Sequence, residues 1–281
     1  MKEVSPLESP EKPPEYMKVF RVRHGETEYK EQTTPGGIAE DQTDLTENGK
    51  QQIEQAADKI AARLDKEKDI VFVASSPRRR TQDTASIIRN KLQELGFELW
   101  DDEKSRSQLI QQRIRNIDVF DADGNALVPT HPDYAGFFNG AVAHIAQEAT
   151  KLGMSDVEYL AANPHPSLET LDSTAKRSRD HLTYLMRVAH AIQPKFTRRL
   201  VIIEAEHVES LDDFTGQVTS QARTEKNKTG MKKGEVVEID IPVSGNELQV
   251  RFIDQEGPGN AYTVKYDATT RTFLNANTLE A

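Results

Sequence analysis

Arg23, His24 and Gly25 are the first residues whose types could do chemistry, and they follow a short apolar run from Lys18 to Val22. The run predicts a strand that presents a guanidinium and an imidazole at its carboxyl end, where Gly25 allows a sharp turn. Ligands of open α/β sheets bind at that edge. An exposed basic loop accounts for these three residues equally well, so the rest of the chain must distinguish the two interpretations.

Two further apolar runs lead to residues of the same kinds. Asp69–Ser75 is followed by Arg78, Arg79 and Arg80, and Arg199–His207 ends in a second histidine. The carboxyl ends of parallel strands meet at one edge of a sheet, so these groups can converge with Arg23 and His24. Arginine donates paired hydrogen bonds to phosphate oxygens, and a neutral histidine can attack phosphorus and hold the phosphoryl group. Because arginines can neutralise the developing charge, we expect a phosphoryl-transfer site that uses no metal and no cofactor.

The elements that must position these groups alternate between strands and helices. Residues 46–68 have helical apolar spacing with Thr46 as the N-cap, and residues 75–96 predict a turn and a helix that ends at Gly96. Phe97–Trp100 is a candidate short strand. This order predicts parallel strands with right-handed crossovers. We therefore predict an α/β fold, a three-layer α/β/α sandwich with a mostly parallel central sheet.

The second half of the chain has a looser pattern. Residues 103–165 predict an insertion that covers the active-site edge, and a long helix is predicted over Ser167–Ile192 with Ser167 as its cap. Other predicted helices are Phe137–Leu152, Asp156–Ala162 and Glu209–Val218, and the predicted late strands are Glu235–Ile241, Glu247–Ile253, Tyr262–Tyr266 and Thr272–Leu274. We expect a disordered tail over 1–16, a main domain over 17–243, and a C-terminal β extension over 244–281. The late strands either extend the sheet or form a small interaction lobe.

The composition limits the partners. Of the 281 residues, 36% are hydrophobic and 29% are charged, and the formal net charge is -10. Nucleic-acid binding needs a basic surface, so we expect no nucleic-acid partner, whereas a local Arg and His cluster can still bind a phosphorylated small molecule or phosphoprotein. No apolar run is long enough to span a membrane, and the N-terminal segment lacks the apolar stretch of a signal peptide. We expect no membrane association and a cytoplasmic location. The absence of cysteine excludes thiol catalysis and thiolate metal sites.

Four motifs, in order, resemble those of the histidine phosphatase superfamily, whose fold is the phosphoglycerate mutase-like fold. They are RHGET at Arg23–Thr27, DLTENGKQQ at Asp44–Gln52, SSPRRRTQDTA at Ser75–Ala85 and LVIIEAEH at Leu200–His207. The segment PSLETLDSTAKR also resembles the helix start that has the sequence G-E-S in relatives. The similarity extends from about residue 17 to residue 240.

The resemblance implies a role for each matching residue. His24 matches the nucleophile that becomes phosphohistidine, and Arg23 matches the arginine beside it that binds phosphoryl oxygens. Arg80 falls at the pocket arginine, and His207 matches the second histidine, which supports the transfer. Thr27 lies where a hydroxyl often holds phosphate. Lys30 replaces the usual Asn and can still contact an anion as a point charge.

The general acid is the main departure from the family pattern. Relatives that hydrolyse alkyl phosphates carry a Glu after the third strand, where this chain has Gln108 and Gln111. Glu103 or Asp118 can substitute, although neither has a convincing spacing. An alkoxide leaving group needs protonation, which typically contributes about a hundred- to ten-thousandfold to the rate. We therefore expect slow turnover of alkyl phosphates and a preference for better leaving groups.

The resemblance implies a metal-independent phosphatase that acts through phosphohistidine. Two alternatives stay open: a catalytically weak or inactive protein that binds a phosphorylated ligand or a partner, and a phosphoglycerate mutase-type phosphotransferase. The retained nucleophile argues against the first alternative. The middle of the chain does not follow the pattern of such mutases, which argues against the second.

Several charged residues near these motifs have a structural interpretation. We expect Arg78 and Arg79 to be solvated turn residues. For Glu204 and Glu206 we expect either a position near solvent or pairing with an arginine, and for His181 a position at the surface or the edge of the core.

Overall fold

The computed structural model describes residues 14–27, 44–100, 117–128, 131–154, 156–219, 231–254 and 261–278. The predicted tail over 1–16 lies largely outside these residues, and the first strand begins at Tyr16. Among the described helices, none is long and apolar enough to cross a membrane.

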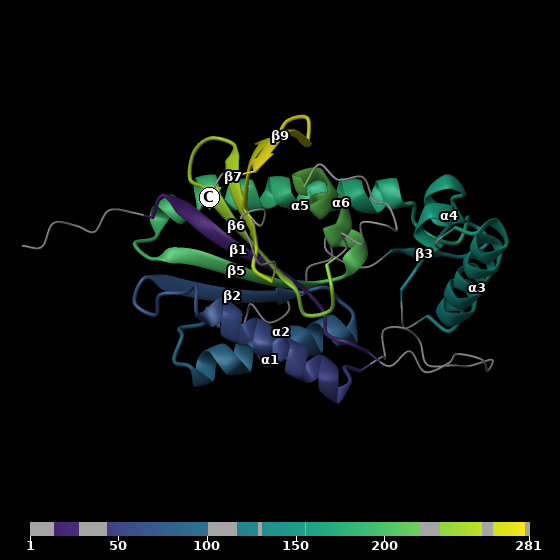
Figure 1. Cartoon of the computed structure of the whole chain (residues 1–281), viewed down its shortest axis with the longest axis horizontal. Helices are drawn as coiled ribbons and strands as arrows, with labels where there is room; N and C mark the ends of the chain where they lie inside the picture. The colour runs from purple at the N-terminus through teal and green to yellow at the C-terminus, as the bar shows by residue number, and fades with distance from the viewer. Residues whose placement is uncertain are drawn as a thin grey trace, which may run out of the picture.

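The centre of the fold is a 7-stranded sheet with the order β2-β5-β1-β6-β7-β8-β9 (Figure 1). Its strands are β1 (Tyr16–Arg23), β2 (Asp69–Ser75), β5 (Arg199–Glu206), β6 (Val236–Pro242), β7 (Glu247–Phe252), β8 (Ala261–Asp267) and β9 (Thr272–Thr278). The strands β2, β5 and β1 are parallel, and β6 to β9 join them antiparallel. The sheet is therefore mixed. Its parallel part consists of the strands that lead to the predicted site, and the late strands extend the sheet.

Helices cover both faces of the sheet, so the predicted α/β/α arrangement is confirmed. The helices α1 (Glu47–Ala61) and α2 (Arg79–Glu94) pack on one face, and α5 (Leu171–Ala191) and α6 (Val208–Thr219) pack on the other (Figure 1). A 3-10 turn, Gln193–Lys195, follows α5. Each face has its own core of buried apolar side chains, such as Phe20 and Val22 towards α1 and Met17 and Val19 towards α5.

Local signals account for the helices next to the predicted site. The hydroxyl of Thr46 accepts a hydrogen bond from the Gly49 amide, which makes Thr46 the N-cap as predicted. The apolar positions that the spacing selects, such as Ile53 and Ile60, are fully buried. The helix ends at Ala61, earlier than the predicted residue 68. After α2 the chain turns at Gly96, whose φ of 83° is the left-handed conformation expected of glycine there.

The start of α5 and the predicted short strand Phe97–Trp100 also differ from the structure. The helix α5 begins at Leu171 with Thr170 as its N-cap, not at Ser167. The Ser167 carbonyl oxygen instead accepts from the Phe120 amide, and Leu168 forms a bridge with Val119. Residues 167–168 therefore pair with residues 119–120 and do not start the helix. Of the predicted strand Phe97–Trp100, only a parallel bridge from Leu99 to β2 is present.

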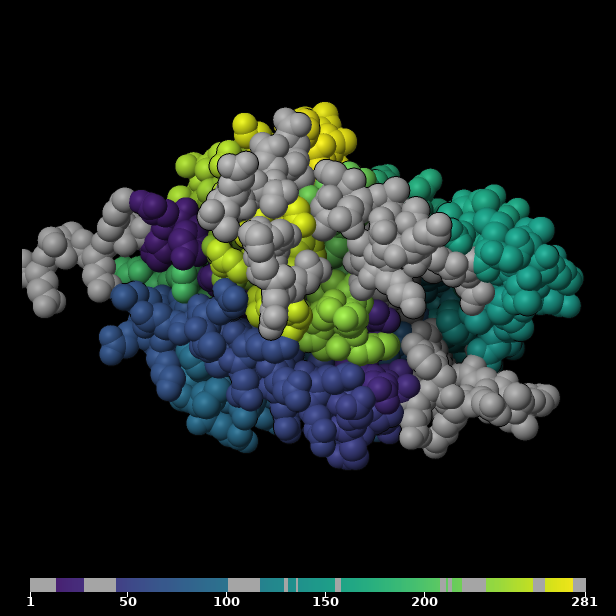
Figure 2. Space-filling model, viewed as in Figure 1, coloured from purple at the N-terminus to yellow at the C-terminus, as the bar shows by residue number. Residues whose placement is uncertain are grey.

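The middle of the chain forms a small lobe beside the main body (Figure 2). It contains β3 (Val119–Phe120), β4 (Ala126–Leu127), α3 (Tyr134–Leu152) and α4 (Asp156–Ala162). The lobe has its own buried cluster, centred on Tyr134, Ala141 and Ile145. It lies on the side towards which β1, β5 and β2 run, which is the side of their carboxyl ends (Figure 1).

Candidate active site

The carboxyl ends of β1, β2 and β5 bring three segments together. The amide of His24 donates to the carbonyl oxygen of Glu206 at 3.1 Å, and the amide of Ser76 donates to that of Ala205 at 3.0 Å. These bonds continue the parallel register for one residue beyond each strand. As a result His24, Ser76 and His207 are neighbours although they are far apart in sequence.

Arg80 joins the two histidines. It lies in the first turn of α2 and is 2% exposed, while His24 is 3% exposed and His207 is fully buried. Its Nε donates to His24 Nε2 at 3.2 Å, and its Nη2 lies 3.2 Å from His207 Nδ1. The centroids of the two imidazole rings are 5.2 Å apart. One guanidinium therefore faces both rings at once.

The donors around the rings determine which nitrogen carries the proton. A guanidinium can only donate, so His24 Nε2 and His207 Nδ1 both accept from Arg80. The other nitrogen of His24, Nδ1, lies 2.8 Å from the Gly25 carbonyl oxygen, which can only accept, and Nδ1 must therefore carry the proton. Because His207 Nδ1 accepts from Arg80, the ring proton is on Nε2, which lies 2.8 Å from Ser76 Oγ and donates to it. Both imidazoles are neutral, and the lone pair of His24 Nε2 faces the site.

Burial and nearby cations keep both rings neutral. Burial is the larger cause, and the Arg80 charge adds to it, so the pKa of His24 and the pKa of His207 lie well below the ordinary histidine value. The Lys233 ammonium lowers both pKa values further. A neutral imidazole is the form that can attack phosphorus. The site therefore keeps a nucleophile ready at neutral pH.

The other predicted site residues have different positions. The charge of Arg23 contributes to the low pKa of His24, while its Nη1 donates to the Met231 carbonyl oxygen. Thr27 is buried, and its hydroxyl has no hydrogen-bond partner among the residues that the structure describes. Lys30 lies outside the described residues. The structure brings His24, Arg80 and His207 together, and the catalytic roles of the predicted residues stay predictions.

The structure adds a cation that sequence reasoning missed. Lys233 Nζ lies 3.3 Å from His24 Nε2 and 3.5 Å from His24 Nδ1. The sequence-based predictions assigned no role to this residue. The available signal was the sequence Lys-Lys-Gly, which ends two residues before the first residue of the apolar strand β6, because a glycine turn at a strand end can direct a neighbouring side chain into a site.

Arg78 is not the solvated turn residue that we expected. It is 4% exposed, its Nη2 donates to the Tyr134 hydroxyl, and its guanidinium carbon lies 5.0 Å from the centre of the Tyr134 ring. The lobe residue Tyr134 thus shields it from water. The charge of Arg78 also lowers the pKa of His207, so it belongs to the surroundings of the site. Arg79 is exposed as predicted and pairs with Asp44 at 2.6 Å.

Two glycines allow the nucleophile segment to approach α1 closely. An added Cβ at Gly25 would lie 2.4 Å from the carbonyl oxygen of Gly49, and one at Gly49 would lie 2.2 Å from that of Glu26. Only glycine fits such backbone contacts at both positions. The carboxylate of Glu26 also accepts from Asn48 at 2.7 Å. The turn after His24 is therefore held against the start of α1.

The two acidic residues of β5 are buried on the α5 side of the sheet. Glu206 forms two hydrogen bonds of 2.6 Å with Arg21, and Glu204 lies 2.6 Å from His181 Nε2. The expectation of pairing with an arginine therefore holds for Glu206. The expectation of a position near solvent is wrong for both, and His181 is 1% exposed, in the core and not at its edge.

The residues considered for the general acid are only partly described. Glu103, Gln108 and Gln111 lie outside the described residues. The backbone amide of Asp118 donates to the Glu169 carboxylate at 3.2 Å, which ties Asp118 to the segment before α5. Within the described part of the chain, no group of three or more His, Asp or Glu residues could hold a metal ion.

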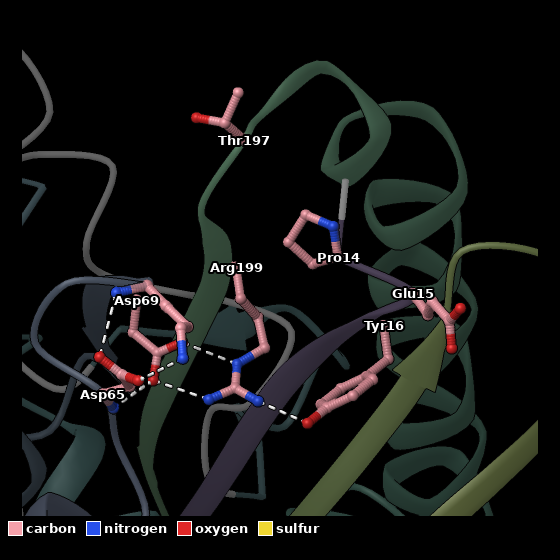
Figure 3. A pocket seen from close by; sticks show the side chains of 8 residues that line it. Pro14, Glu15, Tyr16, Asp65, Asp69, Thr197 and Arg199 are labelled. Carbon is pink, nitrogen blue, oxygen red and sulfur yellow. Dashed lines mark hydrogen bonds and ion pairs between the residues drawn. The ribbon is translucent and has the colours of Figure 1, made fainter. Parts of the chain in front are cut away.

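A separate hollow of about 540 Å³ lies at the opposite, amino-terminal ends of the parallel strands (Figure 3). Arg199 points into it, but its guanidinium already donates to both oxygens of Asp69 at 2.7 Å and to the Tyr16 hydroxyl at 2.5 Å. These donors already have partners, and no histidine is among the described residues that line the hollow, so it has no histidine–arginine arrangement like that around His24.

One family model matches part of the chain. The family model described as histidine phosphatase superfamily (branch 1) matches residues 19–114, which include His24 and Arg80. No curated protein sequence matches the chain.

Solved structures of low identity also align with the chain. A mycobacterial glucosyl-3-phosphoglycerate phosphatase is 18% identical, with 80% of this chain and 90% of that chain covered and a TM-score of 0.46. A phosphoglycerate mutase from Bacillus anthracis is 14% identical, with 81% and 89% covered and a TM-score of 0.49. YhfR of Bacillus stearothermophilus is 15% identical, with 79% and 90% covered and a TM-score of 0.46.

Proposed function

We propose that this chain, which belongs to the histidine phosphatase superfamily, is a metal-independent phosphatase that transfers a phosphoryl group to His24 and then to water. The observation that carries the proposal is the buried pair of neutral imidazoles faced by one guanidinium. Arg80 lies 3.2 Å from a nitrogen of each ring, and His24 Nε2 has its lone pair directed into the site. This arrangement suits a dianionic phosphoryl group, because arginine provides fixed donors for its oxygens.

The proposed reaction has two steps. In the first, the lone pair of His24 Nε2 forms a bond to phosphorus, and the bond from phosphorus to the leaving atom breaks. The leaving atom, an oxygen or the nitrogen of phosphohistidine, keeps the electron pair of that bond and takes a proton from solvent, which the second step returns. In the second, water attacks phosphorus and loses a proton, and the electron pair of the breaking N–P bond returns to Nε2. The net reaction consumes one water and releases inorganic phosphate and the protonated leaving group, which is an alcohol, an acid or an imidazole.

The proton for the leaving group limits the substrate class. Neutral His207 donates its one proton to Ser76, and the predicted acid position carries Gln108 and Gln111. Good leaving groups depart with little need for protonation, and they occur in acyl phosphates, phosphoanhydrides, aryl phosphates and phosphohistidine. The alkoxide that leaves from an alkyl phosphate requires protonation. We therefore expect the enzyme to prefer substrates with good leaving groups. Comparable kcat/KM on glycerol phosphate and on an aryl phosphate would contradict this preference.

The experiment that tests the function is a phosphatase panel on the wild type, on His24→Ala and on His190→Ala as the control. His190 is an exposed histidine of α5, so its removal should leave activity unchanged. The wild type and the control should release phosphate and accumulate an acid-labile phosphoenzyme after rapid quenching. His24→Ala should do neither. Equal turnover by His24→Ala would refute the proposal.

A second candidate is a protein of the same fold that binds a phosphorylated ligand without turning it over. The glutamines at the predicted acid position favour it, because an amide cannot deliver a proton. Under this alternative, inorganic phosphate binds to the wild type, but no substrate is hydrolysed and no phosphoenzyme forms.

A further inference from the structure

We propose that Lys233 is a further phosphoryl-binding residue, which holds a non-bridging oxygen of the phosphoryl group on the side of the attacking histidine. The proposal rests on the proposed transfer to His24, and it adds a ligand from the C-terminal part of the chain. The motifs that carry the family resemblance all lie before residue 208 and do not include it.

The backbone around Lys233 is rigidly positioned. The Glu235 amide donates to the Lys232 carbonyl oxygen at 3.0 Å, which closes a four-residue turn with Lys233 and Gly234 at its centre. Gly234 has a φ of 76°, which favours glycine at the third position of such a turn. An added Cβ at Gly234 would meet the Gln52 side chain at 3.0 Å, so the turn also packs against α1.

The turn is attached to the same strand that carries the nucleophile. The Gly234 amide donates to the Arg23 carbonyl oxygen at 3.1 Å, and the Arg23 amide donates to the Glu235 carbonyl oxygen at 3.1 Å. The Arg23 side chain in turn donates to the Met231 carbonyl oxygen. These bonds hold the backbone on both sides of Lys233 close to Arg23, the residue before His24.

The position of the ammonium indicates what it can contact. Lys233 Nζ is nearly equidistant from the two nitrogens of His24, at 3.3 Å and 3.5 Å, so it lies beside the ring. In an in-line transfer the attacking atom, phosphorus and leaving oxygen lie roughly on one line, and the other three oxygens surround that line. A cation this close to Nε2 is on the near side of phosphorus. It can reach a non-bridging oxygen there, whereas the leaving oxygen is on the far side.

The charge distribution supports the same role. Arg80 Nε donates to His24 Nε2, the Lys233 ammonium lies 3.3 Å from the same nitrogen, and both charges help to keep His24 neutral. When a phosphoryl group approaches Nε2, these donors can move to its oxygens and leave the lone pair free to attack. Fixed cations that face developing charge are a large source of rate enhancement in phosphoryl transfer.

The test compares Lys233→Met and Lys233→Arg with Lys232→Met. Lys232 belongs to the same turn but is exposed, so Lys232→Met is a matched control that should leave all values unchanged. For Lys233→Met we expect kcat/KM to fall by about 10²- to 10³-fold, equally on aryl and alkyl phosphates. Inorganic phosphate should bind more weakly to this variant in calorimetry. Lys233→Arg should recover part of both losses because it keeps the charge.

Other outcomes overturn the proposal. A loss confined to alkyl phosphates would make Lys233 the proton donor of the leaving group instead of a phosphoryl ligand. Unchanged kinetics and phosphate binding in a folded Lys233→Met would exclude any role in the site. If the wild type turns over no substrate, the proposed function fails, but phosphate binding still decides the role of Lys233. In that case, equal phosphate binding by the wild type and Lys233→Met, or no phosphate binding by the wild type, refutes the role of Lys233.

Discussion

Replacing Gly25 with alanine should both destabilise the fold and slow the proposed reaction, because this residue lies against the backbone of α1. The added Cβ would lie 2.4 Å from the carbonyl oxygen and 2.9 Å from the carbonyl carbon of Gly49, whereas ordinary van der Waals contacts begin at 3.4 Å. The two backbones must therefore separate by about 1 Å. Neither contact can be relieved by a side-chain rotation, since both involve backbone atoms.

The magnitude follows from two opposing effects. Forcing a methyl group into a well-packed site costs about 1–3 kcal/mol. The same substitution restricts the unfolded chain, which stabilises by about 0.4–1 kcal/mol. The clash is the larger effect, and we expect the free energy of unfolding to fall by about 1–2 kcal/mol. Because a misplacement of about 1 Å at a reacting group can cost about 100-fold in rate, kcat should fall by that order.

Urea denaturation and phosphatase kinetics measure the two effects separately. Gly25→Ala should lower the denaturation midpoint without a change of slope. Gly140→Ala is the matched control: Gly140 is exposed in α3, and an added Cβ there meets no atom within 4 Å. This control should be more stable by about 0.5–1 kcal/mol and equally active. A Gly25→Ala variant with wild-type midpoint and wild-type kcat would refute the inferred close approach.

Three further predictions concern the charged groups of the site. Arg80→Met should lower kcat/KM by about 10²-fold or more, while Arg79→Met, at an exposed neighbour, should have little effect; equal losses in the two variants would contradict the role of the buried guanidinium. Below about pH 6.5 the two site histidines bind protons in the unfolded chain but stay neutral in the folded protein, because their pKa values are lowered there. The free energy of unfolding should therefore fall as the pH falls, by up to about 1.4 kcal/mol per pH unit for each histidine. In urea denaturation at several pH values, His24→Gln should show a shallower dependence over this window, and an unchanged slope would count against its depressed pKa. Tyr134→Phe should cost about 1–3 kcal/mol, measured by denaturation, because the Arg78 guanidinium loses a buried acceptor; a wild-type midpoint would show that this bond contributes little.

Local signals account for the elements that could be predicted. Apolar runs identified β1, β2 and β5, and the capping hydroxyl of Thr46 and the positive φ of Gly96 match the sequence signals for the start of α1 and the end of α2. The start of α5 was misplaced because Ser167 and Thr170 are both good caps. Pairing of the intervening residues with the lobe selects Thr170.

The sequence by itself determined which residues end the strands, and therefore that His24 and His207 could meet at one edge. This was possible because strand periodicity and capping depend on residues that are close along the chain. The tertiary structure alone decided which charges are buried and beside which partners. It brought Lys233 to His24, Arg78 to Tyr134 and His181 to Glu204. Such contacts join separate elements, and their position depends on packing and desolvation, which no local pattern records.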